Sequence, residues 1–230
     1  MTFDEIKERI LFEDNHLLAF HKPSGVLVQP NETDAESLEV VLKEFIKQRD
    51  AKPGNVYLGV IHRIDRPVSG LVIFAKTSKA LVRMNELFKE RAMKKTYNAI
   101  VKNKPPKESG SIESYLVKDP KTNKSKTYPK AIHGAKLSIT EYNLLESSTS
   151  FYLLEVNPLT GRHHQIRVHL AKIGCPIGGD LKYGSARSNA DGSIYLHAKS
   201  LEFEHPVTKE TLILHCPLPR EGAWKYFQTL

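Results

Sequence analysis

The stretch that decides the fold of this 230-residue chain is His62-Arg63-Ile64-Asp65-Arg66-Pro67-Val68-Ser69-Gly70-Leu71-Val72-Ile73-Phe74-Ala75-Lys76. Apolar runs stand on both sides of its polar part, at residues 58–61 and 71–75, and both have the composition of buried strands. The segment from Arg66 to Gly70 has the residues of a turn or loop. The pattern therefore predicts two buried strands joined by a loop that presents the carboxylate of Asp65.

Asp65 lies between Arg63 and Arg66, and this setting fits two interpretations. An aspartate flanked by arginines most often forms a surface ion pair. A carboxylate held in a loop among cations is also ionised, and it can act as a nucleophile or a base. The residues by themselves favour the ion pair and leave the catalytic interpretation open.

Composition indicates a globular protein that is large enough for one domain over residues 1–230. Hydrophobic residues make up 40% of the chain and charged residues 26%, and no apolar run is long enough to cross a bilayer. The N-terminus is polar and acidic, unlike a secretory signal. Cys175 and Cys216 form no disulfide or metal pattern, so we expect a reduced, cytoplasmic setting.

The positive charge is concentrated in one segment. The formal net charge is +8, and residues 89–136 hold 13 Lys and Arg against 4 Asp and Glu. Such a segment is typical of nucleic-acid binders, although a solvated lysine face gives the same count. Residues 118–126 show no apolar periodicity, and we expect them to form a mobile loop that follows a phosphate backbone.

Hydrophobic periodicity predicts an α+β fold with many strands in hairpins and a few helices. The expected strands are a strand–turn–strand unit over 15–30, a strand over 95–101, and hairpins over 137–156 and 201–215. The expected helices are 34–48, 78–91 with Ser78 as N-cap, 160–174 with Thr160 as N-cap and Gly174 at its end, and a short one over 223–230. The third of these places His163 and Arg167 on one face.

Histidines invite a metal hypothesis, which the spacing does not support. His163, His164 and His169 are close in sequence, but the step of five residues is not the i, i+4 spacing of two ligands on one helical face. No carboxylate or cysteine joins them locally. We therefore expect no metal. Gly161 and the Gly178-Gly179-Asp180 run do not form a phosphate loop, so we expect no nucleotide cofactor.

The stretch around Asp65 resembles the catalytic motif of the RluA-type pseudouridine synthases, His-Arg-Leu-Asp-x-x-Thr-Ser-Gly-Leu, with Ile64 for Leu and Val68 for Thr. Further blocks resemble the family's other motifs, in the family's order: Lys22-Pro23-Ser24-Gly25, Lys95-Thr96-Tyr97, Leu159 to Leu170 followed by Gly179-Asp180 and Tyr183-Gly184, and Tyr195-Leu196-His197-Ala198. His163 departs from the small polar residue that is usual at its position. The resemblance implies a single catalytic domain without the small N-terminal RNA-binding domain of many relatives, built as a large mixed, mostly antiparallel sheet flanked by helices and loops.

The resemblance also implies three catalytic positions. Asp65 corresponds to the catalytic aspartate, and Tyr97 to a tyrosine that stacks on the flipped base and is associated with proton transfer. Arg167 corresponds to the arginine that pairs with the catalytic carboxylate. Without the resemblance, Tyr97 would be interpreted as a core residue and Arg167 as a solvated helical charge.

Four more residues are expected to bind substrate, namely Lys22, Arg63, Arg162 and Leu196. Arg63 would fill the space left by the flipped nucleotide, and Leu196 would pack near the base. The expected partner is RNA, ribosomal or transfer, with no membrane and no cofactor, and the expected oligomeric state is a monomer.

The implied reaction is an isomerisation within one uridine, in which Asp65 either attacks the sugar or removes a ribose proton. One rival is a non-catalytic RNA-binding module, which does not need Asp65. Another is a hydrolase of the same glycosidic bond, which would use a second carboxylate such as Asp180.

Overall fold

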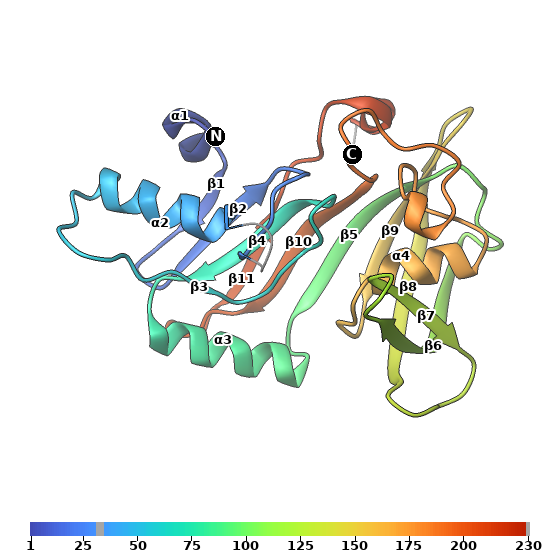
Figure 1. Cartoon of the computed structure of the whole chain (residues 1–230), viewed down its shortest axis with the longest axis horizontal. Helices are drawn as coiled ribbons and strands as arrows, with labels where there is room; N and C mark the ends of the chain where they lie inside the picture. The colour runs from blue at the N-terminus through green and yellow to red at the C-terminus, as the bar shows by residue number, and fades with distance from the viewer. Residues whose placement is uncertain (31–34, 229–230) are drawn as a thin grey trace. The chain divides into compact units, whose positions relative to one another are not determined.

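The computed structural model describes residues 1–30 and 35–228, and its chain divides into two compact units (Figure 1). Unit 1 comprises Met1–Met93 and Ala198–Pro217, and unit 2 comprises Lys94–His197 and Leu218–Leu230. The boundary falls inside strand β10 (Leu196–Glu204). The expectation of one catalytic domain over residues 1–230 stays a prediction.

In its described residues, unit 1 combines three helices with a sheet whose strands β2 and β4 are largely buried (Figure 1). Its helices are α1 (Phe3–Glu8), α2 (Leu38–Arg49) and α3 (Ser78–Glu90). Its strands are β1 (Ile10–Glu13), β2 (Leu17–Lys22), β3 (Gly59–Val60), β4 (Ser69–Ala75), the main part of β10, and β11 (Thr211–His215). Strand β4 pairs with β2 and β3, and β10 pairs with β11. All seven residues of β4 are buried, which requires cover on both faces of the strand.

Two predictions for unit 1 need correction. The second strand of the 15–30 unit is wrong, because the carbonyls of Leu27 and Val28 instead accept the N–H groups of Leu38 and Glu39 at the start of α2. The helix predicted over 34–48 begins at Leu38 after the N-cap Ser37, and residue 34 lies outside the described residues. The other helix is confirmed as α3, with its N-cap one residue earlier than expected, at Thr77.

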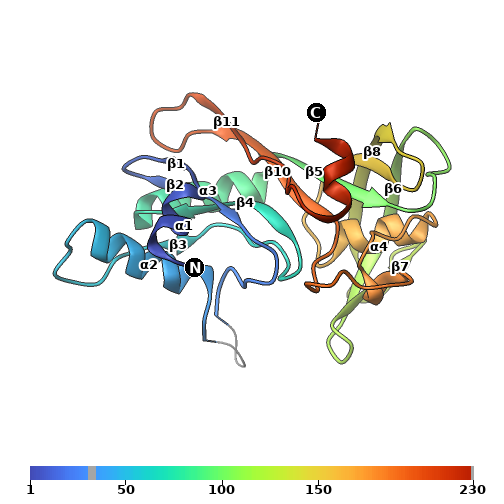
Figure 2. The same ribbon diagram turned by 90° about the horizontal axis from the view of Figure 1, so that it is seen from above.

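Unit 2 is built on a five-stranded antiparallel sheet with the order β5-β9-β8-β6-β7. These strands are β5 (Lys94–Val101), β6 (Ser109–Asp119), β7 (Lys124–Tyr128), β8 (Lys136–Ser147) and β9 (Tyr152–Pro158). Helix α4 (Gln165–Lys172) runs along one face (Figure 2), and the turns η1 (Leu181–Tyr183) and η2 (Gly222–Phe227) complete the unit. The predicted β5 strand and the β8–β9 hairpin are confirmed.

The register shows which residues of unit 2 share the α4 face. Thr140 of β8 bonds His169 of α4, so Tyr142, two residues along the same strand, faces the helix as well. Tyr142 lies opposite Val156, and Val156 lies opposite Tyr97. Tyr97 therefore projects from the sheet face that α4 covers.

The opposite face is covered by the C-terminal turn η2. Ile100 and Leu153 lie side by side on that face and pack with Ala223, Trp224 and Phe227. The helix expected over 223–230 is thus a 3₁₀ turn over Gly222–Phe227, and residues 229 and 230 lie outside the described part.

Two other predictions for unit 2 are wrong. Residues 118–126 are not an open loop, because Lys118 pairs with Ser125 and Asp119 with Lys124 in the β6–β7 hairpin. The predicted helix from Thr160 starts only at Gln165, since the Thr160 hydroxyl bonds the Gln165 side chain instead of capping a helix. His163 is consequently outside α4, and it does not share a helical face with Arg167.

The α+β class is confirmed, since both units combine antiparallel strands with few helices. Gly174 has φ +80°, as expected for the residue that ends α4. Among the described residues, no helix has both the length and the apolar character that a bilayer span requires.

Candidate functional site

In unit 1 the loop between β3 and β4 carries Asp65, whose side chain is half-buried, and Arg63, whose side chain is exposed. The loop closes through its own backbone, because the Val68 N–H donates to the Asp65 carbonyl at 3.0 Å. The Val68 side chain is only 2% exposed. Valine, which stands where the resembling motif has threonine, therefore anchors the loop by apolar burial.

Lys22 fastens this loop to the neighbouring Pro-Ser-Gly loop. Its ammonium nitrogen donates to the carbonyls of Pro23 and Val26 at 2.9 Å and to that of Arg66 at 3.2 Å. The Arg66 carbonyl also accepts the Gly25 N–H, and Arg66 Nε donates to the Gly25 carbonyl, both at 2.8 Å. The Lys22–Gly25 block and the Asp65 loop, which are far apart in sequence, are thus joined by hydrogen bonds.

The Lys22 side chain is fully buried, and this changes its chemistry. Burial lowers the pKa of Lys22 to about 7, the Asp65 carboxylate opposes this shift, and Arg66 adds to it. Lys22 therefore interacts electrostatically with Asp65 from inside unit 1. Its expected role in substrate binding stays a prediction, and its contacts support a role in holding the loop.

Gly70, which follows the loop, and His62, which lies at its start, are also held in place by the fold. Gly70 has φ +117°, and a Cβ at this position would lie 2.5 Å from the backbone nitrogen of Ala198. Only glycine fits both conditions. His62 accepts the Ile73 N–H at 3.1 Å and stacks on Phe88 at 5.2 Å, so both ends of the motif are fastened to the fold.

In unit 2 Arg167 is held by a buried ion pair. Its Nε donates to Asp180 Oδ2 at 2.7 Å and its Nη2 to Asp180 Oδ1 at 2.8 Å, while its guanidinium carbon lies 5.2 Å from the centre of the Tyr183 ring. The Arg167 side chain is 5% exposed. The interpretation of Arg167 as a solvated helical charge is therefore wrong.

Arg162 lies in the segment that leads into α4. Its backbone N–H donates to Gln165 Oε1 at 3.0 Å, and its Nε donates to the Leu137 carbonyl at 3.1 Å. Gln165 also donates to the Thr140 hydroxyl at 2.9 Å and accepts the Thr160 hydroxyl at 2.7 Å. The segment is therefore bonded to β8, which fixes where α4 begins.

The three histidines of this region bond to hydroxyl groups. His169 lies between Ser114 Oγ at 2.8 Å and Thr140 Oγ1 at 2.9 Å, and burial lowers its pKa to about 4. His163 Nδ1 contacts Ser125 Oγ at 3.0 Å, and the stacked His164 ring lies 3.7 Å away. His164 Nδ1 lies 2.8 Å from the Tyr183 hydroxyl, so each of the three histidines has a hydroxyl partner.

Tyr97 and Leu196 differ in exposure. Tyr97 is half-buried on the α4 face of the sheet, whereas Leu196 is 4% exposed at the start of β10. Sequence reasoning gave no role to Tyr183 and treated Asp180 only as an acid for a rival hydrolase. The signal that was available is that a buried arginine needs a carboxylate partner, and Asp180 belongs to a block already matched to the family.

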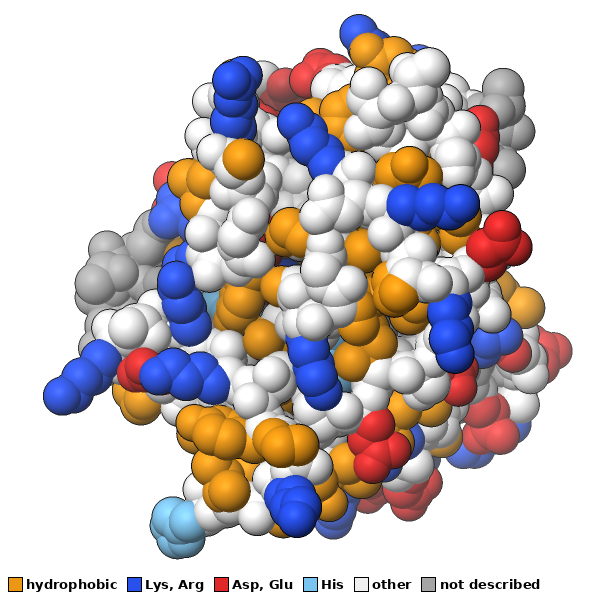
Figure 3. All heavy atoms as spheres, turned by 90° about the vertical axis from the view of Figure 1, so that its right-hand side faces the viewer, with side chains coloured by type: hydrophobic (Ala, Val, Ile, Leu, Met, Phe, Trp, Pro, Cys, Tyr) orange, Lys and Arg blue, Asp and Glu red, His pale blue; other side chains and the backbone are white. Residues whose placement is uncertain are grey.

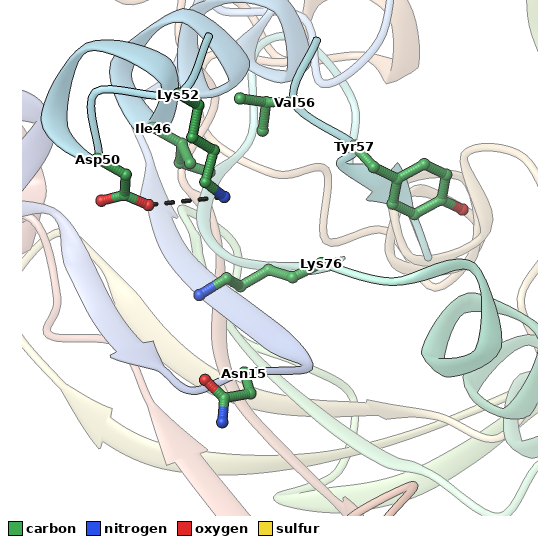
Figure 4. A pocket seen from close by; sticks show the side chains of 7 residues that line it. All are labelled: Asn15, Ile46, Asp50, Lys52, Val56, Tyr57 and Lys76. Carbon is green, nitrogen blue, oxygen red and sulfur yellow. Dashed lines mark ion pairs between the residues drawn. The ribbon is translucent and has the colours of Figure 1, made fainter. Parts of the chain in front are cut away.

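A pocket of about 270 Å³ lies elsewhere in unit 1, and its lining includes none of the expected site residues (Figure 4). Its cations have acidic partners of their own. Lys76 lies 2.7 Å from Glu13, and Lys52 lies 3.7 Å from Asp50. These pairs neutralise the positive charge that an anionic ligand would need.

The net charge differs between the units. Unit 2 holds 18 Lys and Arg against 9 Asp and Glu, and unit 1 holds 16 against 17. Figure 3 shows a face on which lysines and arginines are spread among apolar and uncharged side chains, with some acidic side chains. Such cations can contact the phosphates of a nucleic acid.

Comparison with known proteins decides the family. A family model described as RNA pseudouridylate synthase matches residues 16–172. The chain belongs to the RNA pseudouridylate synthase family. Ribosomal large subunit pseudouridine synthase C of Buchnera aphidicola is 35% identical over 216 residues, covering 91% of this chain and 66% of the relative. The synthase C of Rickettsia bellii is 34% identical over 215 residues, covering 92% of this chain and 69% of the relative.

Solved structures agree with this assignment. Human RNA Pseudouridylate Synthase Domain Containing 4 has a TM-score of 0.79 and 27% identity, covering 95% of this chain and 91% of the human chain. The chain spans about two thirds of the length of the curated relatives. Members of this pseudouridylate synthase family act on RNA and are isomerases. The matched region contains most of the expected site residues, namely Lys22, Arg63, Asp65, Tyr97, Arg162 and Arg167.

Proposed function

We propose that this pseudouridylate synthase converts a specific uridine of a structured ribosomal RNA to pseudouridine, with Asp65 as the essential carboxylate. The observation that carries the proposal is the Asp65 loop, which Lys22 and Gly25 fasten in a chain that belongs to this family. The names of the bacterial relatives support ribosomal RNA over transfer RNA. A monomeric state, a cytoplasmic location and the lack of a cofactor remain predictions.

The reaction breaks the bond between ribose and uracil N1 and rejoins the base through C5, so no atom is gained or lost apart from the proton exchanged at the base. Asp65 must be ionised, whether it attacks the sugar or removes a ribose proton. Half-burial of Asp65 keeps the group within reach of a nucleotide.

The uridine has to leave its stack before it can react, and unstacking costs a few kcal/mol. We assign stacking on the base to Tyr97, which is worth about 1–3 kcal/mol. The net positive charge of unit 2 supplies phosphate contacts that offset the remaining cost. The expected pairing of Arg167 with the catalytic carboxylate stays a prediction, and two hydrogen bonds to Asp180 hold its guanidinium.

The test is pseudouridine mapping on unmodified ribosomal RNA incubated with the wild-type chain, Asp65→Asn or the exposed control Asp4→Asn. We expect one discrete site with the wild type and the control. Asp65→Asn should lower the rate by about 1,000-fold or more and leave RNA affinity within about twofold, because only the charge is removed. Retained turnover in Asp65→Asn would refute the role of Asp65.

The same incubation separates the rival functions. Release of uracil would indicate a hydrolase, and salt-sensitive RNA binding without any modified site would indicate a binding module. The contacts of Asp180 argue against the first rival, because both of its oxygens accept hydrogen bonds from Arg167. Asp180 is thereby held as the partner of a cation, not as a proton donor.

A further inference from the structure

Tyr183 lies at the point where several elements of unit 2 meet, and the proposed reaction gives it no role. It follows Asp180 in the η1 turn, and its N–H donates to the Asp180 carbonyl at 3.1 Å. The two residues hold Arg167 from different directions. Asp180 bonds the edge of the guanidinium formed by Nε and Nη2, and the Tyr183 ring lies 5.2 Å from its carbon. A cation over an aromatic ring is attracted by the ring quadrupole.

The Tyr183 hydroxyl makes two further contacts. It accepts the backbone N–H of Ser125 at 2.7 Å and lies 2.8 Å from His164 Nδ1. Burial raises the pKa of Tyr183, so the phenol keeps its hydrogen at neutral pH. Since Ser125 donates to the oxygen, the phenol hydrogen can be donated to His164.

His164 lies directly before helix α4. Its φ of +53° lies in the left-handed region, which few residues other than glycine adopt, and it is the N-cap of α4 without a side-chain cap bond. Its carbonyl accepts the Val168 N–H at 3.0 Å and so begins the helix that carries Arg167. The Tyr183 hydroxyl therefore fixes the start of α4, while the Tyr183 ring contacts Arg167 directly.

Ser125 connects the same tyrosine to the lysine-rich hairpin. It lies in β7, and its hydroxyl donates to the His163 carbonyl at 2.6 Å and contacts His163 Nδ1 at 3.0 Å. The exposed Lys118 and Lys126 are on the paired strands of this hairpin, and Lys118 is directly opposite Ser125. One chain of contacts thus runs from the hairpin through Tyr183 to Arg167.

We propose that Tyr183 is a positioning residue, which holds the Arg167 guanidinium in place and ties its orientation to the β6–β7 hairpin. The proposal rests on the proposed function, because the value of a fixed Arg167 lies in the isomerisation. A guanidinium that is already oriented does not have to be ordered during the reaction, and this lowers the barrier to the chemical step. Its loss should therefore reduce kcat more than it raises KM.

A double-mutant cycle on kcat tests this coupling. Tyr183→Leu should lower kcat about 30-fold and change KM for RNA by less than about threefold, and Tyr183→Phe, which keeps the ring, should lose about fivefold. In the Arg167→Lys background, Tyr183→Leu should cost less than about twofold, because the guanidinium it positions is already absent. The matched control Tyr152→Phe, at a half-buried tyrosine of β9, should leave both constants unchanged.

A second measurement does not depend on activity. NMR exchange of the Arg167 Nε–H with solvent should be at least about tenfold faster in Tyr183→Leu than in the wild type or in Tyr152→Phe. If the wild type makes no pseudouridine but Tyr183→Leu accelerates this exchange, the proposed function is wrong. The conclusion that Tyr183 positions Arg167 is then still supported. Unchanged exchange, or a loss of kcat that is the same in both backgrounds, would overturn the positioning role.

Discussion

Unit 1 and unit 2 bury their internal cations in different ways. In unit 1 the ammonium of Lys22 is surrounded by three backbone carbonyls, and burial lowers its pKa to about 7. In unit 2 the guanidinium of Arg167 is paired with a buried carboxylate through two hydrogen bonds. Arginine stays protonated at any ordinary pH, whereas a buried lysine loses its proton readily. The part of the fold that holds Asp65 should therefore respond to pH more strongly than the part that holds Arg167.

The largest expected effect comes from breaking the buried pair of unit 2. Asp180→Asn leaves the Arg167 charge without its carboxylate and should lower the free energy of unfolding by about 3–5 kcal/mol. Glu13→Gln breaks the more exposed ion pairs that Glu13 forms with Arg49 and Lys76 in unit 1 and should cost about 1–2 kcal/mol. Urea unfolding measures both values. Equal losses would show that burial does not distinguish these ion pairs.

Next in size is the backbone restriction beside Asp65. Gly70→Ala places a Cβ against the Ala198 backbone at a φ of +117°, and should lower the free energy of unfolding by about 3 kcal/mol. Gly54→Ala is the control, because a Cβ at Gly54 meets nothing within 4 Å. Thermal unfolding of the two variants compares them directly. An unchanged free energy of unfolding in Gly70→Ala would mean that β4 can move away from Ala198 at no cost in stability.

A smaller effect is the pH dependence of unit 1. The pKa of Lys22 is about 7 in the folded chain and near 10.5 when unfolded, so between these values the unfolded chain binds more protons. The wild type should therefore gain stability relative to Lys22→Met as pH rises from about 7 to about 10, and the difference should be constant below about pH 6. Urea midpoints measured across this range test the sign.

The exposed Lys79→Met is the control for that measurement. Its difference from the wild type should not change with pH over the same range, because the Lys79 side chain stays in solvent in the folded chain. A difference between wild type and Lys22→Met that falls with rising pH would contradict the lowered pKa of Lys22.

The smallest expected effect tests the charge of unit 2. Replacing Lys118, Lys121 and Lys126 with alanine should weaken RNA binding about tenfold and reduce the salt slope by about 2, with kcat at saturating RNA unchanged. The matched triple variant replaces Lys7, Lys47 and Lys79, which are exposed on the helices of unit 1. An equal loss of RNA affinity in both triple variants would show that binding depends on the net charge of the protein and not on where the lysines lie.

Local patterns were sufficient to predict much of this molecule. Strand β4, helix α3, strand β5 and the two hairpins follow from apolar periodicity and caps, which depend on neighbours within a few residues. Asp65 was singled out by its motif, whose residues are adjacent in sequence, and its catalytic role stays a prediction. The predicted strand over residues 26–30 is wrong because the carbonyls of Leu27 and Val28 accept hydrogen bonds from the start of α2, about ten residues away.

The sequence by itself determined the α+β class, the family resemblance, the expected carboxylate Asp65 and the basic segment of the chain. Only the tertiary structure decided that Lys22 bonds to the Asp65 loop and that Asp180 and Tyr183 both contact Arg167. It also decided that α4 starts at Gln165. The physical reason is that a buried charge must find its partners in space, and the spacing of residues along the chain does not specify those partners.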